Sequence, residues 1–325
     1  MSTPIDPRAA GLRDRLRGSL AAAALTPMTR AGEVDLDVAE AYFRRLAASG
    51  ADALAVLAHT GRGPFLPAPV RAGLITRARR AGVPVIVGVG GGPATGGTRD
   101  AGAAGGANGG TAGGTAGGTA GGMAGAVADA RMAAELGADG VLVFPEPGDR
   151  VALHEAVWSA AGLPMIAFDL YTNPCPPATL RRILALPGVA GLKTALLSDA
   201  MGCQETIALT REAGRLAITG EDRMFAPSLL WGAQAALVGV AAASVGTTAA
   251  VLRAYEGGDL RGFEKAAARL DRLAAATFTA PMEGYVQRMA WLAAAEGLVP
   301  EEHAHDPHGP ALPDGERARV LAALA

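Results

Sequence analysis

The sequence predicts an α/β protein, a (β/α)8 TIM barrel with a C-terminal helical extension. Short apolar segments of strand length alternate eight times with segments whose apolar residues recur at helical spacing. Several of these segments are apolar throughout, which is typical of parallel strands buried on both faces. Gly50, Gly137 and Gly232 each stand between a predicted helix and the next strand, where a left-handed residue closes the helix. Eight such units in 325 residues fit one closed barrel.

Local signals set the bounds of the predicted elements. Thr26 and Pro27 end the first apolar run, and the first helix after it begins at the acidic Asp35 and is closed by Gly50. The predicted strands are residues 20–25, 50–58, 83–89, 140–144, 164–170, 188–193, 215–219 and 235–240. The predicted helices are residues 35–48, 67–81, 123–136, 149–161, 177–186, 198–213, 222–231 and 247–255.

We expect residues 1–256 to form the barrel and residues 257–325 the extension, with helices at 261–277, 282–296 and 316–325. A glycine-rich insertion at about 91–122 interrupts the barrel after its third strand. Its Thr-Ala-Gly-Gly repeats predict a flexible segment. The glycines that open it do not form a dinucleotide-binding loop, because Pro93 takes the third glycine position and no helix follows directly.

Composition excludes several functional classes. A net charge of −2 gives no basic surface for nucleic acid, and no apolar run is long enough to span a membrane. The two cysteines, Cys175 and Cys203, provide no disulfide framework, which favours the reducing cytoplasm. Three histidines at 303, 305 and 308 lie in a predicted loop without the spacing of a metal site. We therefore expect neither a metal nor a cofactor.

The residue that points to chemistry is Lys193, one of only two lysines in a chain with 29 Lys and Arg residues. It stands at the end of the predicted sixth strand, and active sites of such barrels lie at the C-terminal strand ends. A lysine amine that loses its proton can attack a carbonyl and form a Schiff base. Apolar neighbours such as Val189 and Leu192 favour the neutral amine.

Ordered motifs make the chain resemble the dihydrodipicolinate synthase / N-acetylneuraminate lyase family of class I aldolase-type barrels. These motifs are Leu25-Thr-Pro27, His59-Thr60-Gly61 after the second strand, Gly191-Leu-Lys193, and Thr219-Gly220-Glu221-Asp222 after the seventh strand. The resemblance covers about residues 11–300. It implies that Lys193 condenses with the ketone of a 2-oxo acid such as pyruvate. It also implies that Thr60 and backbone N–H groups around Gly61 hold the carboxylate, and that Gly239 borders the pocket.

The chain departs from the family pattern where that pattern has a proton-shuttling tyrosine at the end of strand five. Phe168 takes this place, and phenylalanine carries no exchangeable proton. We propose His59 or Tyr171 as the general acid/base instead. Simple alternation puts Tyr171 on the opposite face of the strand, unless the strand ends before it. The loop 172–176 also lacks the arginine that the lysine-pathway enzyme uses on its second substrate.

The expected function is therefore a Schiff-base-dependent lyase, aldolase or dehydratase acting on pyruvate or another 2-oxo acid, other than dihydrodipicolinate synthase itself. The alternative is a non-catalytic binder of a 2-oxo acid or sugar acid that has lost the proton relay. A third hypothesis, a pyridoxal-phosphate enzyme using the same lysine, lacks an evident phosphate-binding loop. The family resemblance also implies a homo-oligomer, a dimer or a tetramer.

Overall fold

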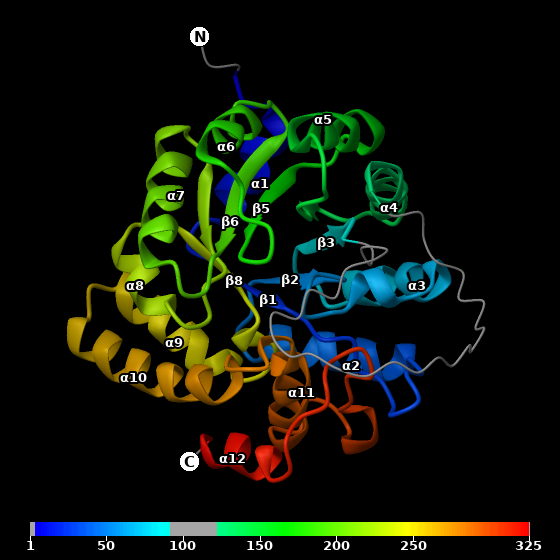
Figure 1. The fold of residues 1–325 in the computed structure, drawn as a ribbon, viewed down its shortest axis with the longest axis vertical. Coiled ribbons are helices and arrows are strands. Elements are labelled where there is room, and N and C mark those ends of the chain that lie inside the picture. The colour runs from blue at the N-terminus through cyan, green and yellow to red at the C-terminus, as the bar shows by residue number, and fades with distance from the viewer. Residues whose placement is uncertain (1–3, 92–121, 325) are drawn as a thin grey trace, which may run out of the picture.

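A computed structural model describes residues 4–91 and 122–324, so most of the predicted glycine-rich insertion lies outside the described residues. The chain forms a closed parallel barrel in which β1 to β8 pair in sequence order and β8 closes onto β1 (Figure 1). The strands are β1 Leu20–Ala23, β2 Ala53–Val56, β3 Val85–Val89, β4 Gly140–Val143, β5 Met165–Leu170, β6 Val189–Ala195, β7 Leu216–Thr219 and β8 Ala235–Val238. The predicted TIM barrel is thus confirmed.

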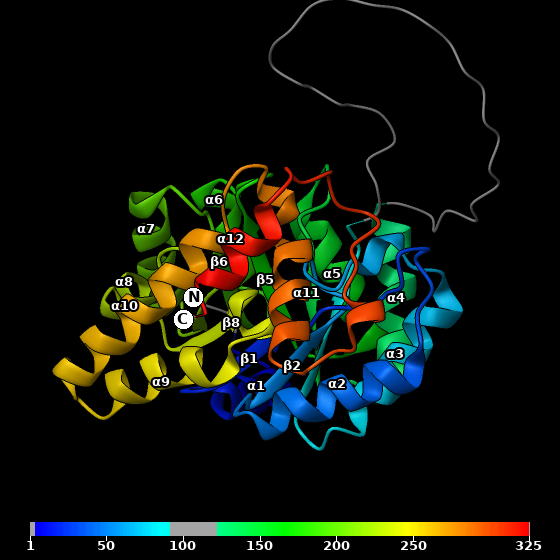
Figure 2. The same cartoon turned by 90° about the horizontal axis from the view of Figure 1, so that it is seen from below.

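The helices of the barrel lie outside the strands, and further helices follow at the C-terminus (Figures 1 and 2). The helices of the barrel part are α1 Pro7–Leu16, α2 Leu36–Ala48, α3 Ala68–Arg79, α4 Met123–Glu135, α5 Arg150–Ala161, α6 Pro177–Leu184, α7 Ala200–Glu212, α8 Phe225–Leu230 and α9 Val245–Glu256. The C-terminal helices are α10 Leu260–Thr277, α11 Tyr285–Ala295 and α12 Glu316–Ala322. Short 3-10 turns lie at Gly63–Phe65, Val240–Ala242, Met282–Gly284 and Glu301–His303.

The predicted glycine stops adopt the expected geometry. Gly50, Gly137 and Gly232 have φ values of +106°, +77° and +102°, in the region that a side chain disfavours. Each stands just after a helix and just before the loop into the next strand, so the helix ends there and the chain reverses toward the barrel.

Small and large side chains complement one another inside the barrel. Alanines line the interior on β1 and β2, and larger residues such as Ile86, Leu142 and Leu237 belong to the same buried cluster. Helix α1, which the sequence analysis did not assign, adds Leu12 and Leu16 to the same cluster. The backbone N–H of Asp6 bonds to the Pro187 carbonyl just before β6, so α1 covers the N-terminal end of the barrel. Each buried leucine there stabilises the fold by about 1.5–3 kcal/mol.

A fully buried arginine holds parts of the C-terminal extension together. Arg288 on α11 donates to the carbonyl oxygens of Thr277 and Thr279, among others, and pairs with Glu316 at 2.7 Å. A buried guanidinium is tolerated only when such partners satisfy its donors. The bonds hold the turn between α10 and α11 in place, and that turn carries Phe278, Glu283 and Tyr285 to the open end of the barrel.

The ends of two strands matter for the site; the end of the sixth differs from prediction and the end of the fifth agrees with it. The sixth strand runs to Ala195, so Lys193 lies two residues before its end. The fifth strand ends at Leu170, so Tyr171 is the first residue after it. Among the described residues, none of the helices is long and apolar enough to cross a membrane.

Candidate active site

Lys193 lies inside the C-terminal end of the barrel, with its side chain only 6 % exposed. Phe168 pairs with it across β5 and β6, and the Lys193 Nζ lies 4.3 Å from the centre of the Phe168 ring. Burial lowers the pKa of Lys193 to about 8, while the negative charges of Asp222 and Glu221 act in the opposite direction. A substantial share of these amines is therefore neutral near physiological pH.

The loop after β7 supplies the two buried carboxylates near this amine. Burial raises the pKa of Asp222 to about 7, although the backbone N–H of Val240 donates to it at 2.7 Å. Burial likewise raises the pKa of Glu221 to about 7, and its carboxylate accepts from the N–H groups of Leu196 and Leu197. The charges of these two carboxylates and of Lys193 therefore influence one another.

Gly220 in the same loop makes room for the lysine. A Cβ atom at this position would stand 2.3 Å from the Lys193 Cε and 2.8 Å from the Thr194 carbonyl oxygen. The glycine therefore lets the loop approach close enough to border the amine. This is the physical reason for a glycine within Thr219-Gly220-Glu221-Asp222.

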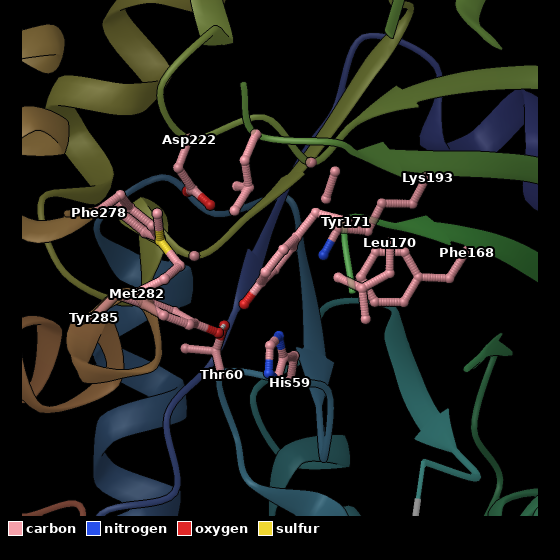
Figure 3. A pocket seen from close by; sticks show the side chains of 14 residues that line it. His59, Thr60, Phe168, Leu170, Tyr171, Lys193, Asp222, Phe278, Met282 and Tyr285 are labelled. Atoms are coloured by element: carbon pink, nitrogen blue, oxygen red, sulfur yellow. Dashed lines mark hydrogen bonds between the residues drawn. The ribbon is translucent and has the colours of Figure 1, made fainter. Parts of the chain in front are cut away.

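The two acid/base candidates, His59 and Tyr171, meet at one carboxylate. Tyr171 Oη donates to Glu283 Oε1 at 2.6 Å, and His59 Nε2 lies 3.1 Å from Glu283 Oε2. The stated exception to alternation applies to Tyr171, because β5 ends at Leu170 before it and the ring turns into the pocket. Figure 3 shows its hydroxyl pointing toward Thr60 and His59, with the Lys193 amine beside its ring.

Opposing effects set the charge states of this pair. Burial acts to raise the pKa of Glu283, but hydrogen bonds from His59, Tyr171 and Arg62 hold it well below its usual range. Burial and the bond to Glu283 raise the pKa of Tyr171, so the phenol keeps its proton at neutral pH. The geometry thus provides a protonated phenol in contact with a carboxylate that accepts from it.

Arg62 ties the C-terminal segment over the pocket. Its guanidinium, 3 % exposed, lies 2.8 Å from Glu283 and 2.8 Å from Asp306, and the Asp306 side chain is fully buried. Replacing Arg62 would leave the buried Asp306 carboxylate without its cation, which costs far more than the loss of a surface pair. The network therefore positions Glu283 as much as it stabilises the fold.

Thr60 faces the pocket, whereas Gly61 does not. Thr60 Oγ1 lies 3.1 Å from Tyr285 Oη, and the Tyr285 ring stacks on Phe278 with centres 4.9 Å apart. The Gly61 N–H is bonded to the Ala58 carbonyl, so the expected carboxylate contact from this N–H is already occupied. Gly61 is instead a close-packing residue, since a Cβ there would lie 3.0 Å from the Ala24 carbonyl oxygen.

Strained backbone gathers around the same end of the barrel. The non-glycine residues with positive φ are Leu57, Arg62, Leu197 and Ser244 among the described residues, at +58°, +52°, +59° and +46°. Each lies in a loop or turn that follows β2, β6 or β8. Such conformations cost about 1–3 kcal/mol each and persist at functional sites when packing enforces them.

The pocket brings together most of the predicted site residues and several that the sequence analysis missed. Its lining includes the predicted His59, Thr60, Phe168, Tyr171, Lys193 and Gly239. The predicted Gly61 does not line it. Residues that complete the lining without having been predicted are Leu170, Ala195, Leu197, Gly220, Asp222, Phe278, Met282 and Tyr285.

Comparisons with known proteins show which family and fold the chain is similar to. A model of the Dihydrodipicolinate synthetase family matches residues 114–324. The chain is 28% identical over 250 residues to 4-hydroxy-tetrahydrodipicolinate synthase 1 of Streptomyces coelicolor, covering 73% of this chain and 71% of that protein.

Two solved structures illustrate the similarity in fold. The dihydrodipicolinate synthase of Agrobacterium tumefaciens superposes with a TM-score of 0.75 at 22% identity, covering 96% of this chain and 98% of that one. The N-acetylneuraminate lyase of Mycoplasma synoviae superposes with a TM-score of 0.72 at 15% identity, covering 95% and 97%. At these identities the solved structures establish the shared fold.

Proposed function

The chain belongs to the dihydrodipicolinate synthetase family, and on that premise we propose that it is a Schiff-base-dependent lyase, aldolase or dehydratase acting on pyruvate or another 2-oxo acid. The observation that carries the proposal is the buried amine of Lys193, whose pKa is lowered to about 8 inside a pocket lined with hydroxyl groups. A neutral amine in such a place is a nucleophile toward a ketone.

In the proposed mechanism Lys193 attacks the ketone carbon of the 2-oxo acid and water leaves. The resulting iminium draws electrons from the neighbouring carbon, so that a C–C or C–O bond next to it can form or break. Thr60 and Tyr285 hold the substrate carboxylate, because their hydroxyl groups lie 3.1 Å apart at the wall of the pocket. Asp222 stabilises the positive charge that remains on the iminium.

Tyr171 and His59 supply the proton transfers in this proposal, with Glu283 between them. The phenol reaches the substrate side of the pocket, and the carboxylate that it bonds orients both the phenol and the His59 ring. Tyr171 and His59 thus supply the proton transfer that Phe168, which has no exchangeable proton, cannot supply. The presence of this pair also favours catalysis over the alternative of a binding protein without a proton relay.

Trapping with borohydride tests the proposal directly. Pyruvate plus borohydride should add one reduced pyruvyl group to the Lys193 peptide, read by mass spectrometry. A second assay measures whether the protein cleaves a 4-hydroxy-2-oxo acid and releases pyruvate. Measured release identifies an enzyme, whereas a binding protein releases none. Folded protein that forms no adduct with any of several small 2-oxo acids would refute the Schiff-base assignment.

The rate of adduct formation should depend on pH because the attacking amine must be neutral. Below its pKa of about 8, Lys193 binds a proton, so the reactive fraction falls about tenfold for each further pH unit. We expect the rate with cyanoborohydride and limiting pyruvate to rise from pH 6 to 8 and then level off. A flat profile over this range contradicts a lysine that titrates there.

Assembly and location belong to the same proposal. We propose a homo-oligomer, dimer or tetramer, in the cytoplasm. Met201 on α7 and Leu230 on α8 are 74% and 64% exposed, which suits helices that contact another subunit. Both cysteines are free and buried, as expected in a reducing compartment.

A further inference from the structure

We propose that the carbon chain beyond the 2-oxo acid is uncharged and apolar, so that the natural partner in the aldol reaction is of the aromatic-aldehyde class. This inference rests on the proposed function and adds the substrate class to it. The fragment would lie in a passage formed by Tyr171, Leu197, Phe278 and Met282. We call these four residues the outer passage.

The outer passage connects the lysine pocket with a groove at the surface. The four residues line both the inner pocket and the neighbouring groove, so the two cavities are continuous there. Figure 3 shows Phe278 and Met282 on one side of the space and Phe168 and Leu170 on the other. A substrate held by Lys193 therefore extends between apolar and aromatic side chains, which suit a flat ring.

The charges around the pocket oppose a second carboxylate. The basic side chains that line the pocket among the described residues are Lys193, which forms the imine, and His59, which is bonded to Glu283. The nearby Arg62 is already shared between Glu283 and Asp306. An additional carboxylate would lose its water without gaining a cation, and that desolvation is costly.

The surface groove adds no net preference for a negative charge. It contains one cation, Arg223, and one carboxylate, Asp199, and the Arg223 guanidinium donates to the Phe278 carbonyl at 3.3 Å. Opposite charges in one groove cancel for an approaching anion. The apolar walls of the outer passage therefore determine which aldehyde is preferred.

The reaction with such a partner balances without any added oxidant or reductant. The pyruvate imine on Lys193 loses a proton from its methyl carbon to His59, and the enamine carbon forms a bond to the aldehyde carbon. The aldehyde oxygen takes a proton from Tyr171, and the proton held by His59 then restores the phenol, so that no proton is gained or lost overall. Water then hydrolyses the imine, which frees the lysine and releases a 4-hydroxy-2-oxo acid.

A matched pair of aldehydes tests the inference. With pyruvate as donor, kcat/KM is measured for 4-methylbenzaldehyde and for 4-carboxybenzaldehyde, which are similar in shape but differ in charge; succinic semialdehyde is the aliphatic carboxylated comparison. We expect 4-methylbenzaldehyde to be favoured over each carboxylated aldehyde by about tenfold or more, the equivalent of about 1.4 kcal/mol. Borohydride trapping of pyruvate on Lys193 is measured in parallel for every variant.

A charge placed in the outer passage should reverse the preference. Met282→Arg supplies a cation beside the apolar wall and should lower the ratio of neutral to carboxylated aldehyde by about tenfold. Met282→Leu changes shape without charge, so its ratio should stay in favour of the neutral aldehyde.

The possible outcomes separate the two proposals. If pyruvate is trapped but a carboxylated aldehyde is preferred, or no aldehyde gives product, the apolar substrate class is wrong and the Schiff-base function stands. If pyruvate is not trapped on Lys193, the proposed Schiff-base function itself is wrong, and the substrate class that rests on it is wrong as well. A ratio that Met282→Arg leaves unchanged also overturns the assignment of the outer passage.

Discussion

Replacing Lys193 with methionine should lower turnover by at least about 10⁴-fold, because loss of a covalent nucleophile removes the reaction path itself. Methionine keeps an unbranched apolar stem in the buried site, so packing against Phe168 is largely preserved. The nearby Asp222, whose pKa is already about 7, can take a proton when its cationic neighbour is gone. The fold should therefore persist, as checked by the thermal unfolding midpoint.

Two further variants make this prediction specific. Lys193→Arg keeps a positive charge but cannot lose its proton, so it should be as inactive as Lys193→Met. Lys265→Met removes the other lysine, which is exposed on α10, and should retain both turnover and the borohydride adduct. An adduct on Lys265, or residual activity of Lys193→Arg within about tenfold of the parent, would show that Lys193 is not the nucleophile.

The barrel was predictable because its signals are local and repeated. A strand buried on both faces must be apolar over several consecutive residues, and the chain carries such runs at regular intervals. Glycines such as Gly50 and Gly232 mark the reversals because only a residue without a side chain adopts their φ values easily. Lys193 followed from the same pattern, since the order of the strands fixes which end carries the site.

The rest of the site was not predictable because it depends on contacts between distant parts of the chain. Glu283 and Tyr285 stand at the start of a predicted helix and carry no motif, yet they meet His59 and Thr60 more than 200 residues earlier. Nothing in the local sequence states that the turn after α10 folds back over the barrel. The buried Arg288, which holds that turn, has the local context of an ordinary surface arginine on a helix.

Tyr171 illustrates why alternation alone is a weak guide at the end of a strand. The rule that successive side chains face opposite sides holds only while the backbone stays extended. The strand stops at Leu170, and the turn that follows redirects the Tyr171 ring toward the pocket occupied by Lys193. If β5 ended one residue later, alternation would turn the Tyr171 phenol away from the lysine pocket.

The phenol leads to the second large prediction. Tyr171→Phe should lower kcat by about 10²–10⁴-fold, the usual contribution of a positioned acid or base, because no other group would protonate the aldehyde oxygen so directly. The Tyr171 hydroxyl is bonded to Glu283 at 2.6 Å, so its loss also leaves that carboxylate with one fewer donor. Trapping of pyruvate on Lys193 should change much less than kcat, because imine formation precedes this step.

Matched variants separate a proton-transfer role from a structural one. Tyr255→Phe removes a phenol on α9 that packs against Phe263 outside the lysine pocket, and should keep the parent kcat. Glu283→Gln keeps the shape of the side chain but removes the negative charge that orients the phenol and the imidazole, so it should lower kcat in the same direction as Tyr171→Phe. If Tyr171→Phe keeps full turnover while His59→Gln loses it, the imidazole is the acid/base and the phenol only orients Glu283. Because both groups bond the same carboxylate, the double variant should then be no slower than His59→Gln alone.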